Sequence, residues 1–251
     1  MNATPQRVAA FFDIDGTLVP DPPLEGRMFQ NLRRGGGIPA MNYARWAVEA
    51  LKLLPRGLTA IAQGNKAYLQ SLRVEQVLEA IAPIAFFQEG VARMEWHARQ
   101  GHEIALVSGM VKPVAWLAAM ALECELEARG VAKEILVCAT RLEERNGAFT
   151  GRVIGDANYG EAKSKAMSVL AKTMQIELRE SHAYGNTLHD LPMLGAAGRA
   201  HAVNPGRELA RVANQRDWPI WHWHQEKPAA CGAVLQERVK FQMTGTRTGM
   251  V

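Results

Sequence analysis

The stretch Val8–Val19, "VAAFFDIDGTLV", decides how the rest of the sequence is interpreted. Its first part, Val8–Phe12, is a short apolar run typical of a strand that is buried on both faces. Asp13 and Asp15 follow one residue apart, so in an extended chain both carboxylates leave on one side while Ile14 points into the core. Two carboxylates this close repel each other unless a cation or a shared proton lies between them. The stretch therefore predicts a divalent metal at the end of a buried strand, with a solvated acidic turn as the alternative.

The composition is that of an ordinary globular protein. The chain has 251 residues, 48% of them hydrophobic, which is enough to bury a full core as one domain or one domain with an insert. The net charge of +4 suits an anionic ligand, but the basic residues are dispersed, so we expect no nucleic acid partner. Three cysteines without C-x-x-C spacing favour a reducing cytoplasm. No signal peptide or membrane span is indicated, and we expect a cytoplasmic monomer or homodimer.

Three later stretches place polar residues at strand ends or at a helix start. The apolar run "EIALV" ends in Ser108 and Gly109, whose hydroxyl and unhindered N–H suit the oxygens of a phosphate. The stretch "NYGEAKSKAMSVLAK" opens a helix with two lysines in its first turn that point to different faces. The stretch "GNTLHDLPML" follows an expected strand at 181–185 and carries Asn186 and Asp190. Because ligands bind at the carboxyl ends of strands in open α/β sheets, these stretches are expected to meet at one edge.

In their order, the four stretches resemble the motifs of the haloacid dehalogenase-like hydrolases, and within that superfamily the phosphoserine phosphatase-like branch, subfamily IB. The resemblance spans roughly Val8 to Trp223. It implies a Mg²⁺-dependent phosphomonoester hydrolase that acts on a small phosphorylated metabolite through an aspartyl-phosphate. In that family the first aspartate is the nucleophile, the second is the general acid and base, and a lysine at a helix start neutralises charge; Lys165 is the alternative lysine here. The implied site is catalytic Asp13, Asp15 and Lys163, substrate contacts at Thr17, Ser108 and Gly109, and metal ligands Asp13, Asp15, Asn186 and Asp190.

Asn186 departs from the family pattern, which usually has an aspartate at this position. An amide oxygen can bind Mg²⁺, but the change removes one negative charge from the site, so we expect weaker metal binding. Two alternatives therefore stay open: a catalytically impaired phosphate-binding protein, and a phosphotransferase that passes the phosphoryl group to an alcohol.

The order of elements predicts an α/β fold, a three-layer, doubly wound and mostly parallel sheet with a small helical cap inserted after the first strand. The expected core covers residues 1–20 and 91–225, the cap 21–90, and a C-terminal tail 226–251. In the cap we expect only helices, at 24–34, 39–54, 58–72, 74–82 and 83–100. In the core we expect strands at 103–107 and 135–139, a helix at 113–129 and a scaffold hairpin at Asn146-Gly147. The tail is expected to form a short helix through Lys240 and then to be disordered.

The cap is expected to set substrate specificity. Six of its arginines are candidates for binding a carboxylate or second phosphate: Arg27, Arg33, Arg34, Arg45, Arg56 and Arg73. Four further residues offer an apolar pocket lining, although their helical spacing favours the core: Met28, Met41, Trp46 and Met94. His189 is expected in an exposed loop. His222 and His224 alternate with tryptophans, which favours an edge strand over a metal-binding pair.

Overall fold

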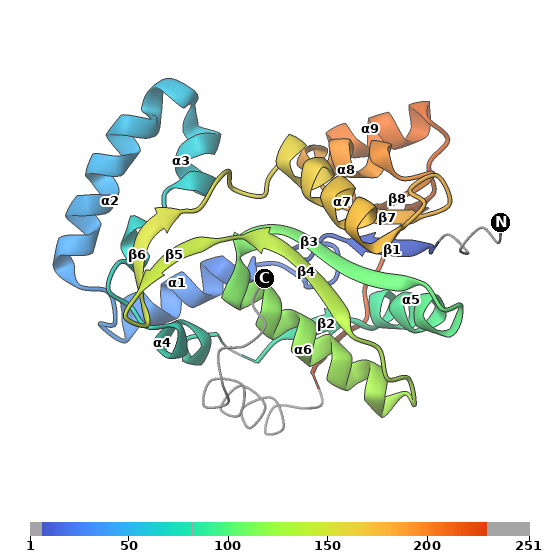
Figure 1. Cartoon of the computed structure of the whole chain (residues 1–251), viewed down its shortest axis with the longest axis horizontal. Helices are drawn as coiled ribbons and strands as arrows, with labels where there is room; N and C mark the ends of the chain where they lie inside the picture. Colours follow the sequence, from blue (N-terminus) through green and yellow to red (C-terminus); the bar gives the residue numbers. More distant parts are fainter. Residues whose placement is uncertain (1–6, 82, 230–251) are drawn as a thin grey trace.

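A six-stranded parallel sheet forms the centre of the protein (Figure 1). The computed structural model describes residues 7–81 and 83–229. Every pairing within this sheet is parallel. Its strands, in spatial order, are β4 (Ile135–Thr140), β3 (Glu103–Val111), β1 (Ala9–Phe12), β7 (His182–Gly185), β8 (Arg199–Val203) and β9 (Ile220–Trp221). The predicted strand β1 therefore lies inside the sheet, and all four of its residues are buried.

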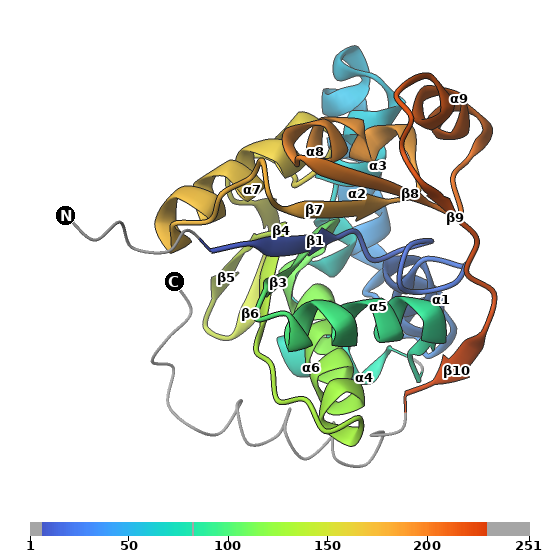
Figure 2. The same ribbon diagram turned by 90° about the vertical axis from the view of Figure 1, so that its right-hand side faces the viewer.

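Helices cover both faces of the sheet. Figure 2 shows α5 (Gln88–Arg99) and α6 (Lys112–Ala128) on one face, and α7 (Glu161–Met174) and α8 (Leu191–Ala196) on the other. A further helix, α9 (Arg207–Gln215), joins the second group. Alternate residues of β1 face opposite ways, so Ala10 and Phe12 join one hydrophobic cluster while Ala9 and Phe11 join the other. The predicted three-layer α/β architecture is confirmed.

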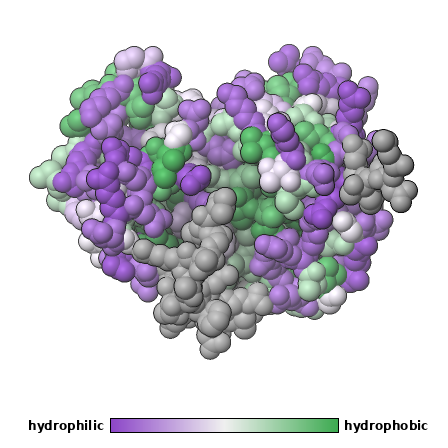
Figure 3. All heavy atoms as spheres, viewed as in Figure 1, coloured by the Kyte–Doolittle hydropathy of each residue, from purple (hydrophilic) through white to green (hydrophobic). Residues whose placement is uncertain are grey.

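The segment that follows β1 is mainly helical, but the expectation of helices alone over 21–90 is wrong, because Ala85–Phe87 forms a strand. Figure 1 shows α2 and α3 at one end of the molecule, away from the sheet. In the space-filling view a notch separates this end from the side that carries α7, α8 and α9 (Figure 3). The exact boundaries between core and cap stay a prediction. The elements of this segment are α1 (Leu24–Arg34), α2 (Ala40–Leu53), η1 (Leu54–Arg56), α3 (Leu58–Gly64), η2 (Ala67–Leu69) and α4 (Val74–Glu79).

The predicted hairpin is confirmed, and it contacts the predicted cap. Strands β5 (Leu142–Arg145) and β6 (Ala148–Val153) pair antiparallel around Asn146 and Gly147, which both have positive φ. The hairpin reaches the cap through backbone hydrogen bonds from Ser71 N to Phe149 O (2.8 Å) and from Phe149 N to Leu72 O (2.9 Å). The hairpin therefore contacts the predicted cap, and its assignment to the core stays a prediction.

A strand interrupts the segment predicted to be a helix over 83–100. Residues Ala85–Phe87 form β2, and the helix α5 begins only at Gln88. Strand β2 pairs antiparallel with β10 (Glu226–Pro228), which lies in the predicted tail. Local sequence could not reveal this pairing, because the partner strand is distant in the chain. The helix expected through Lys240 and the disordered end lie outside the described residues, which stop at 229.

Other element boundaries differ in smaller ways. The helix predicted over 58–72 is divided into α3 and the turn η2, and β3 continues to Val111 instead of ending at 107. Strand β9 ends at Trp221, so the expected edge strand stops short of His222 and His224, which are exposed. No helix within residues 7–81 and 83–229 combines the length and apolar character needed to cross a membrane.

Candidate active site

The carboxyl ends of the central strands open into a cavity of about 850 Å³. Asp13 and Asp15 follow β1, Ser108 lies in β3, Asn186 follows β7, and Lys163 comes from the first turn of α7; all five line this cavity. These residues are far apart in the sequence. The parallel sheet brings them together because its strand ends share one edge, as the sequence predicts.

Lys163 joins two buried carboxylates. Its Nζ donates to Asp13 Oδ1 at 2.5 Å and to Asp190 Oδ1 at 2.6 Å. The three side chains are almost fully buried. Lys165 is exposed and is excluded as the equivalent group. The arrangement holds one Asp13 oxygen against a fixed positive charge, which suits a site where a phosphoryl group is to be bound.

Burial changes the proton affinity of these groups. Burial raises the pKa of Asp13 to about 7, against the opposing effect of the Lys163 ammonium group. Burial alone would lower the pKa of Lys163, but the Asp13 and Asp190 carboxylates outweigh it and raise the pKa above its usual value. Lys163 therefore stays protonated near neutral pH.

Asp15 contacts the start of the first helix of the predicted cap. Its Oδ1 accepts a hydrogen bond from Leu24 N, at the start of α1, at 2.8 Å. Burial raises the pKa of Asp15 to about 6, although the hydrogen bond from Leu24 opposes the shift. A carboxyl group with such a pKa can give or take a proton near neutral pH, as general acid–base chemistry requires.

Asn186 has the character of a cation ligand. Its Oδ1 is the one buried side-chain oxygen or nitrogen among the described residues that has no hydrogen-bond partner. The loop after β1 approaches it so closely that a Cβ on Gly16 would lie 1.9 Å from Asn186 Nδ2. This unpaired amide oxygen belongs to a residue that lines the same cavity as Asp13 and Asp15. Carboxylate, main-chain carbonyl and amide oxygens are the donors that Mg²⁺ prefers, so these residues fit the ion.

Asp190 is held by several donors. Its Oδ2 accepts hydrogen bonds from Asn186 N (3.1 Å), Thr187 N (2.9 Å) and Thr187 Oγ1 (3.0 Å). Its other oxygen accepts from Lys163. Asp190 therefore fixes the loop that carries Asn186 and orients Lys163, and it is less available to a metal than Asn186 is.

The predicted substrate contacts divide into two groups. Ser108 and Gly109 line the cavity. Thr17 is absent from the cavity lining; its Oγ1 donates to Asp13 Oδ2 at 3.3 Å, so it orients Asp13 from behind. Asn158 is a residue that sequence reasoning missed, and its Nδ2 donates to Ser108 O (3.1 Å) and Cys138 O (2.7 Å). A single asparagine before a helix start gives no specific signal of this role.

The cap supplies an aromatic wall. Phe29, Tyr43, Trp46 and Tyr68 line the same cavity as Asp13 and Asp15. The expectation that Trp46 belongs to the core is therefore wrong, because the side chain faces the cavity and is 40% exposed.

The other cap candidates are dispersed. Met28 and Met94 belong to the core as favoured, whereas Met41 is exposed. Of the six arginines, Arg33 lines the catalytic cavity. Arg27 instead donates to the carbonyl oxygens of Pro20 and Pro22. His189 is exposed as expected and packs against the ring of Tyr159.

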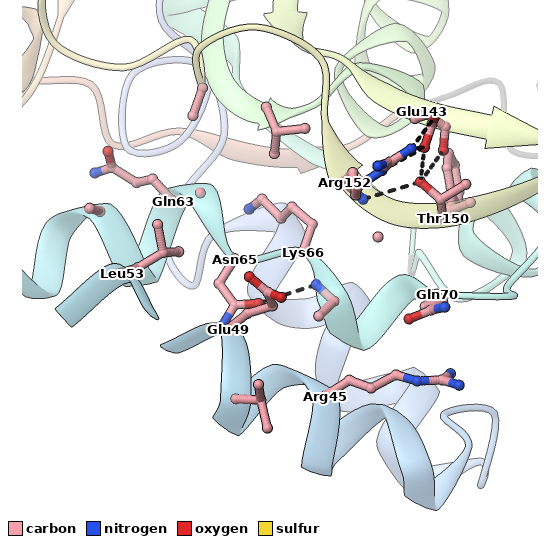
Figure 4. Close-up of a pocket in the computed structure, with 18 of the residues that line it drawn as sticks. Arg45, Glu49, Leu53, Gln63, Asn65, Lys66, Gln70, Glu143, Thr150 and Arg152 are labelled. Carbon is pink, nitrogen blue, oxygen red and sulfur yellow. Dashed lines mark hydrogen bonds and ion pairs between the residues drawn. The ribbon is translucent and has the colours of Figure 1, made fainter. Parts of the chain in front are cut away.

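A second cavity, of about 1160 Å³, lies between the cap helices and the β5–β6 hairpin (Figure 4). Arg45 lines it, and Glu143 there holds Arg152 and Thr150. Gln63 and Asn65 form a wall that both cavities share. The second cavity is larger than the first, but none of the predicted catalytic residues lines it.

Comparison with known proteins adds family information to this geometry. A family model described as haloacid dehalogenase-like hydrolase matches residues 10–195. A protein of Streptomyces azureus called inhibition of morphological differentiation protein is 29% identical over 236 residues, covering 87% of this chain and 79% of its own. A putative hydrolase of Mycobacterium leprae is 30% identical, covering 88% and 75%. Phosphoserine phosphatase SerB1 of Mycobacterium tuberculosis is 29% identical, covering 88% and 73%.

Solved structures have the same fold. A Bordetella pertussis protein described as having unknown function superposes with a TM-score of 0.62 at 25% identity, covering 86% of this chain and 98% of its own. A structure described as a phospho-aspartyl intermediate analogue of phosphoserine phosphatase gives a TM-score of 0.56 at 20% identity, covering 94% and 99%. At that identity the second likeness concerns the fold alone.

Proposed function

This chain belongs to the haloacid dehalogenase-like hydrolase family, and we propose that it is a Mg²⁺-dependent phosphatase that hydrolyses a small phosphorylated metabolite through an aspartyl-phosphate. The resemblance to the phosphoserine phosphatase branch agrees with a relative of that name. The observation that carries the proposal is the buried carboxylate of Asp13, held at 2.5 Å by Lys163 at the bottom of a cavity that Asp15 also lines.

In the first half of the reaction, an Asp13 oxygen attacks phosphorus in line with the leaving group. A bond between the carboxylate and phosphorus forms while the ester P–O bond breaks. Protonated Asp15 gives its proton to the leaving oxygen, so an alcohol departs. The pKa of about 6 at Asp15 supports this role, since part of the population holds a proton near neutral pH.

In the second half, Asp15 acts as a base. The carboxylate takes a proton from a water molecule, whose oxygen attacks the phosphorus of the aspartyl-phosphate. The bond to Asp13 breaks, phosphate leaves, and both aspartates return to their starting states.

Lys163 and Ser108 complete the phosphoryl site. A cation about 4 Å from an anionic phosphoryl group contributes on the order of 4 kcal/mol at an effective dielectric constant near 20. The Ser108 hydroxyl and the Gly109 backbone, both in the cavity wall, are suited to phosphate oxygens. Asp13, the main-chain carbonyl of Asp15 and Asn186 would hold Mg²⁺, with Asp190 supporting them. When bound, the ion would offset negative charge on the phosphoryl oxygens.

A cytoplasmic location forms part of the proposal. Cys124 and Cys138 are free thiols in the described part of the chain. Unpaired cysteines without a redox motif are typical of a reducing compartment.

The test replaces the nucleophile. Asp13→Asn should lower the rate of Mg²⁺-dependent hydrolysis of p-nitrophenyl phosphate by roughly 10⁴-fold or more, because an amide cannot form the acyl phosphate. Asp217→Asn makes the same chemical change at an exposed turn residue and should retain full activity. Mg²⁺-dependent activity retained by Asp13→Asn would overturn the mechanism.

The same assay addresses two other functions. Absence of Mg²⁺-dependent phosphate release by the unmodified chain would favour the impaired phosphate-binding protein that Asn186 allows. Formation of a new phosphate ester with an added alcohol would favour the phosphotransferase.

A further inference from the structure

The part of the catalytic cavity that faces the cap has a distinct chemistry. Asp13, Asp15 and Lys163 form its floor. The walls above them are mainly apolar, and the aromatic residues among them are Phe29, Tyr43, Trp46, Tyr68 and Tyr159. A phosphomonoester whose phosphorus lies at Asp13 would place its leaving group against these rings.

One acidic residue of the cap, Glu25, lines this region, and it is already bonded. Its Oε1 accepts from Lys66 Nζ in a buried ion pair and from Tyr68 OH at 2.8 Å. Its Oε2 accepts from Val111 N at 3.2 Å. Both carboxylate oxygens are thus engaged and the charge is neutralised. Among the described cap residues that line the cavity, an ammonium group on a substrate would find no available carboxylate unless the Lys66 pair were broken, and breaking a buried ion pair is costly.

The aromatic residues at the mouth are more available than Glu25. Tyr43 and Trp46, both on α2, are each 40% exposed and line the cavity. Neither ring stacks on another aromatic ring of the described residues. Exposed aromatic faces at a concave site mark a surface where an apolar or planar ligand is bound. Arg33, also in the lining and exposed, is the cation on this side.

We propose that this region is a leaving-group subsite for an aromatic alcohol, so that the substrate class is a phosphomonoester with a planar ring system and no ammonium group. The subsite uses Trp46 and Tyr43 as a stacking surface, and Arg33 tolerates an anionic substituent at the rim. The proposal rests on the proposed function in one respect: the phosphoryl group is placed at Asp13. It also separates this chain from a phosphoserine phosphatase, whose substrate carries an ammonium group.

Phosphonates test the subsite without depending on catalysis, because their P–C bond is not hydrolysed. Binding of benzylphosphonate, cyclohexylmethylphosphonate and aminomethylphosphonate is measured by calorimetry on the full chain with Mg²⁺. We expect benzylphosphonate to bind about tenfold or more tightly than aminomethylphosphonate, and roughly 2- to 10-fold more tightly than the non-planar cyclohexyl analogue. Equal or tighter binding of aminomethylphosphonate would overturn the proposal, and equal binding of the cyclohexyl analogue would overturn its aromatic specification.

A pair of variants on one helix tests the residues. Trp46→Ala should weaken benzylphosphonate binding about tenfold and reduce its preference over aminomethylphosphonate. Leu51→Ala, also on α2 but 70% exposed and outside the cavity lining, should leave both affinities unchanged. Identical affinities in the two variants would overturn the assignment of Trp46.

Hydrolysis of p-nitrophenyl phosphate by the same preparations tests the proposed function separately from the subsite. Preferential benzylphosphonate binding without hydrolysis would contradict the proposed function and leave the subsite intact. Hydrolysis accompanied by a preference for aminomethylphosphonate would contradict the subsite and leave the proposed function intact.

Discussion

At the scale of single residues, Asn186 is the position where this site departs from the usual motif of the family. It offers a buried oxygen without a hydrogen-bond partner in the described part of the chain, at the place where the metal-binding motif of the family usually has an aspartate. The amide keeps the oxygen but removes one negative charge. The expected consequence is a site that binds Mg²⁺ more weakly and without loss of geometry.

Restoring the charge tests this interpretation. Asn186→Asp should lower the Mg²⁺ concentration needed for half-maximal hydrolysis roughly 3- to 10-fold, because a carboxylate attracts the ion more strongly than an amide does. Asn146→Asp makes the same change in the distant hairpin turn, where aspartate is also favoured, and should leave the Mg²⁺ requirement unaltered. Matching Mg²⁺ titrations for the two variants would show that Asn186 does not contact the ion.

A substitution at Gly16 tests how closely the loop after β1 approaches Asn186. It has a φ of +77°, and a Cβ there would lie 1.9 Å from Asn186 Nδ2. Gly16→Ala should therefore raise the Mg²⁺ concentration for half-maximal rate about tenfold. Gly155→Ala is a matched control, since its φ is +71° and no atom lies within 4 Å of the added methyl.

Both glycine variants are expected to lose about 1 kcal/mol of unfolding free energy from the left-handed backbone. Only Gly16→Ala should change the metal titration. If Gly155→Ala changed it to the same extent, backbone strain and not crowding of Asn186 would be responsible.

At the scale of elements, α5, β7 and β8 share a histidine cluster that sequence reasoning did not single out. His97 Nδ1 lies 2.9 Å from His102 Nδ1, and His97 Nε2 lies 2.8 Å from Tyr184 OH. His182 Nδ1 lies 3.0 Å from His201 Nε2. The ring nitrogens of His97, His102 and His182 approach within 4.8 Å of one another, and each of the three rings already has a hydrogen-bond partner. We interpret the cluster as a packed, neutral junction between the elements.

The junction makes stability depend on pH. Burial lowers the pKa of His97 to about 2, of His201 to about 3 and of His182 to about 4. In the unfolded chain the same groups titrate near 6.5. Below that pH the unfolded chain binds protons that the folded chain does not. Stability is therefore fully present above pH 6.5 and is lost progressively as the pH falls toward the folded-state pKa values of about 4, 3 and 2.

The expected loss is up to about 1.4 kcal/mol per pH unit for each such histidine. Urea unfolding at pH 7 and at pH 5 measures it. His201→Gln should show a smaller difference between the two pH values than the unmodified chain, and His222→Gln, an exposed histidine, should show the same difference. An unchanged difference in His201→Gln would mean that the junction is not titrated on unfolding.

The elements also show where sequence reasoning succeeds and where it fails. Strands β1 and β3, which precede or carry Asp13, Asp15 and Ser108, were predictable because each contains a local apolar run followed by a polar residue. Strand β2 was not, because its partner β10 lies in a segment predicted to be a tail. The contact of the hairpin with the cap depends on tertiary packing, which local pattern does not encode.

At the scale of the whole molecule, the sheet edge and the cap contribute different residues to the cavity. The sheet edge supplies the charged groups, and its residues were predicted one by one from motifs. The cap supplies the aromatic wall, whose residues could not be predicted from the sequence. Met28 and Trp46 both lie at positions where helical spacing favours the core, but only Met28 is buried there. The cap's role becomes visible only once the cavity is formed.

The covalent state of Asp13 during turnover tests the central claim most directly. Borohydride reduces an acyl phosphate, so we predict homoserine at position 13 when the chain is treated during hydrolysis of p-nitrophenyl phosphate with Mg²⁺, and aspartate when substrate is omitted. Mass spectrometry of the peptide that contains "FFDIDGTLV" reads the result. Active enzyme in which Asp13 stays aspartate while a different residue is reduced would contradict the central claim.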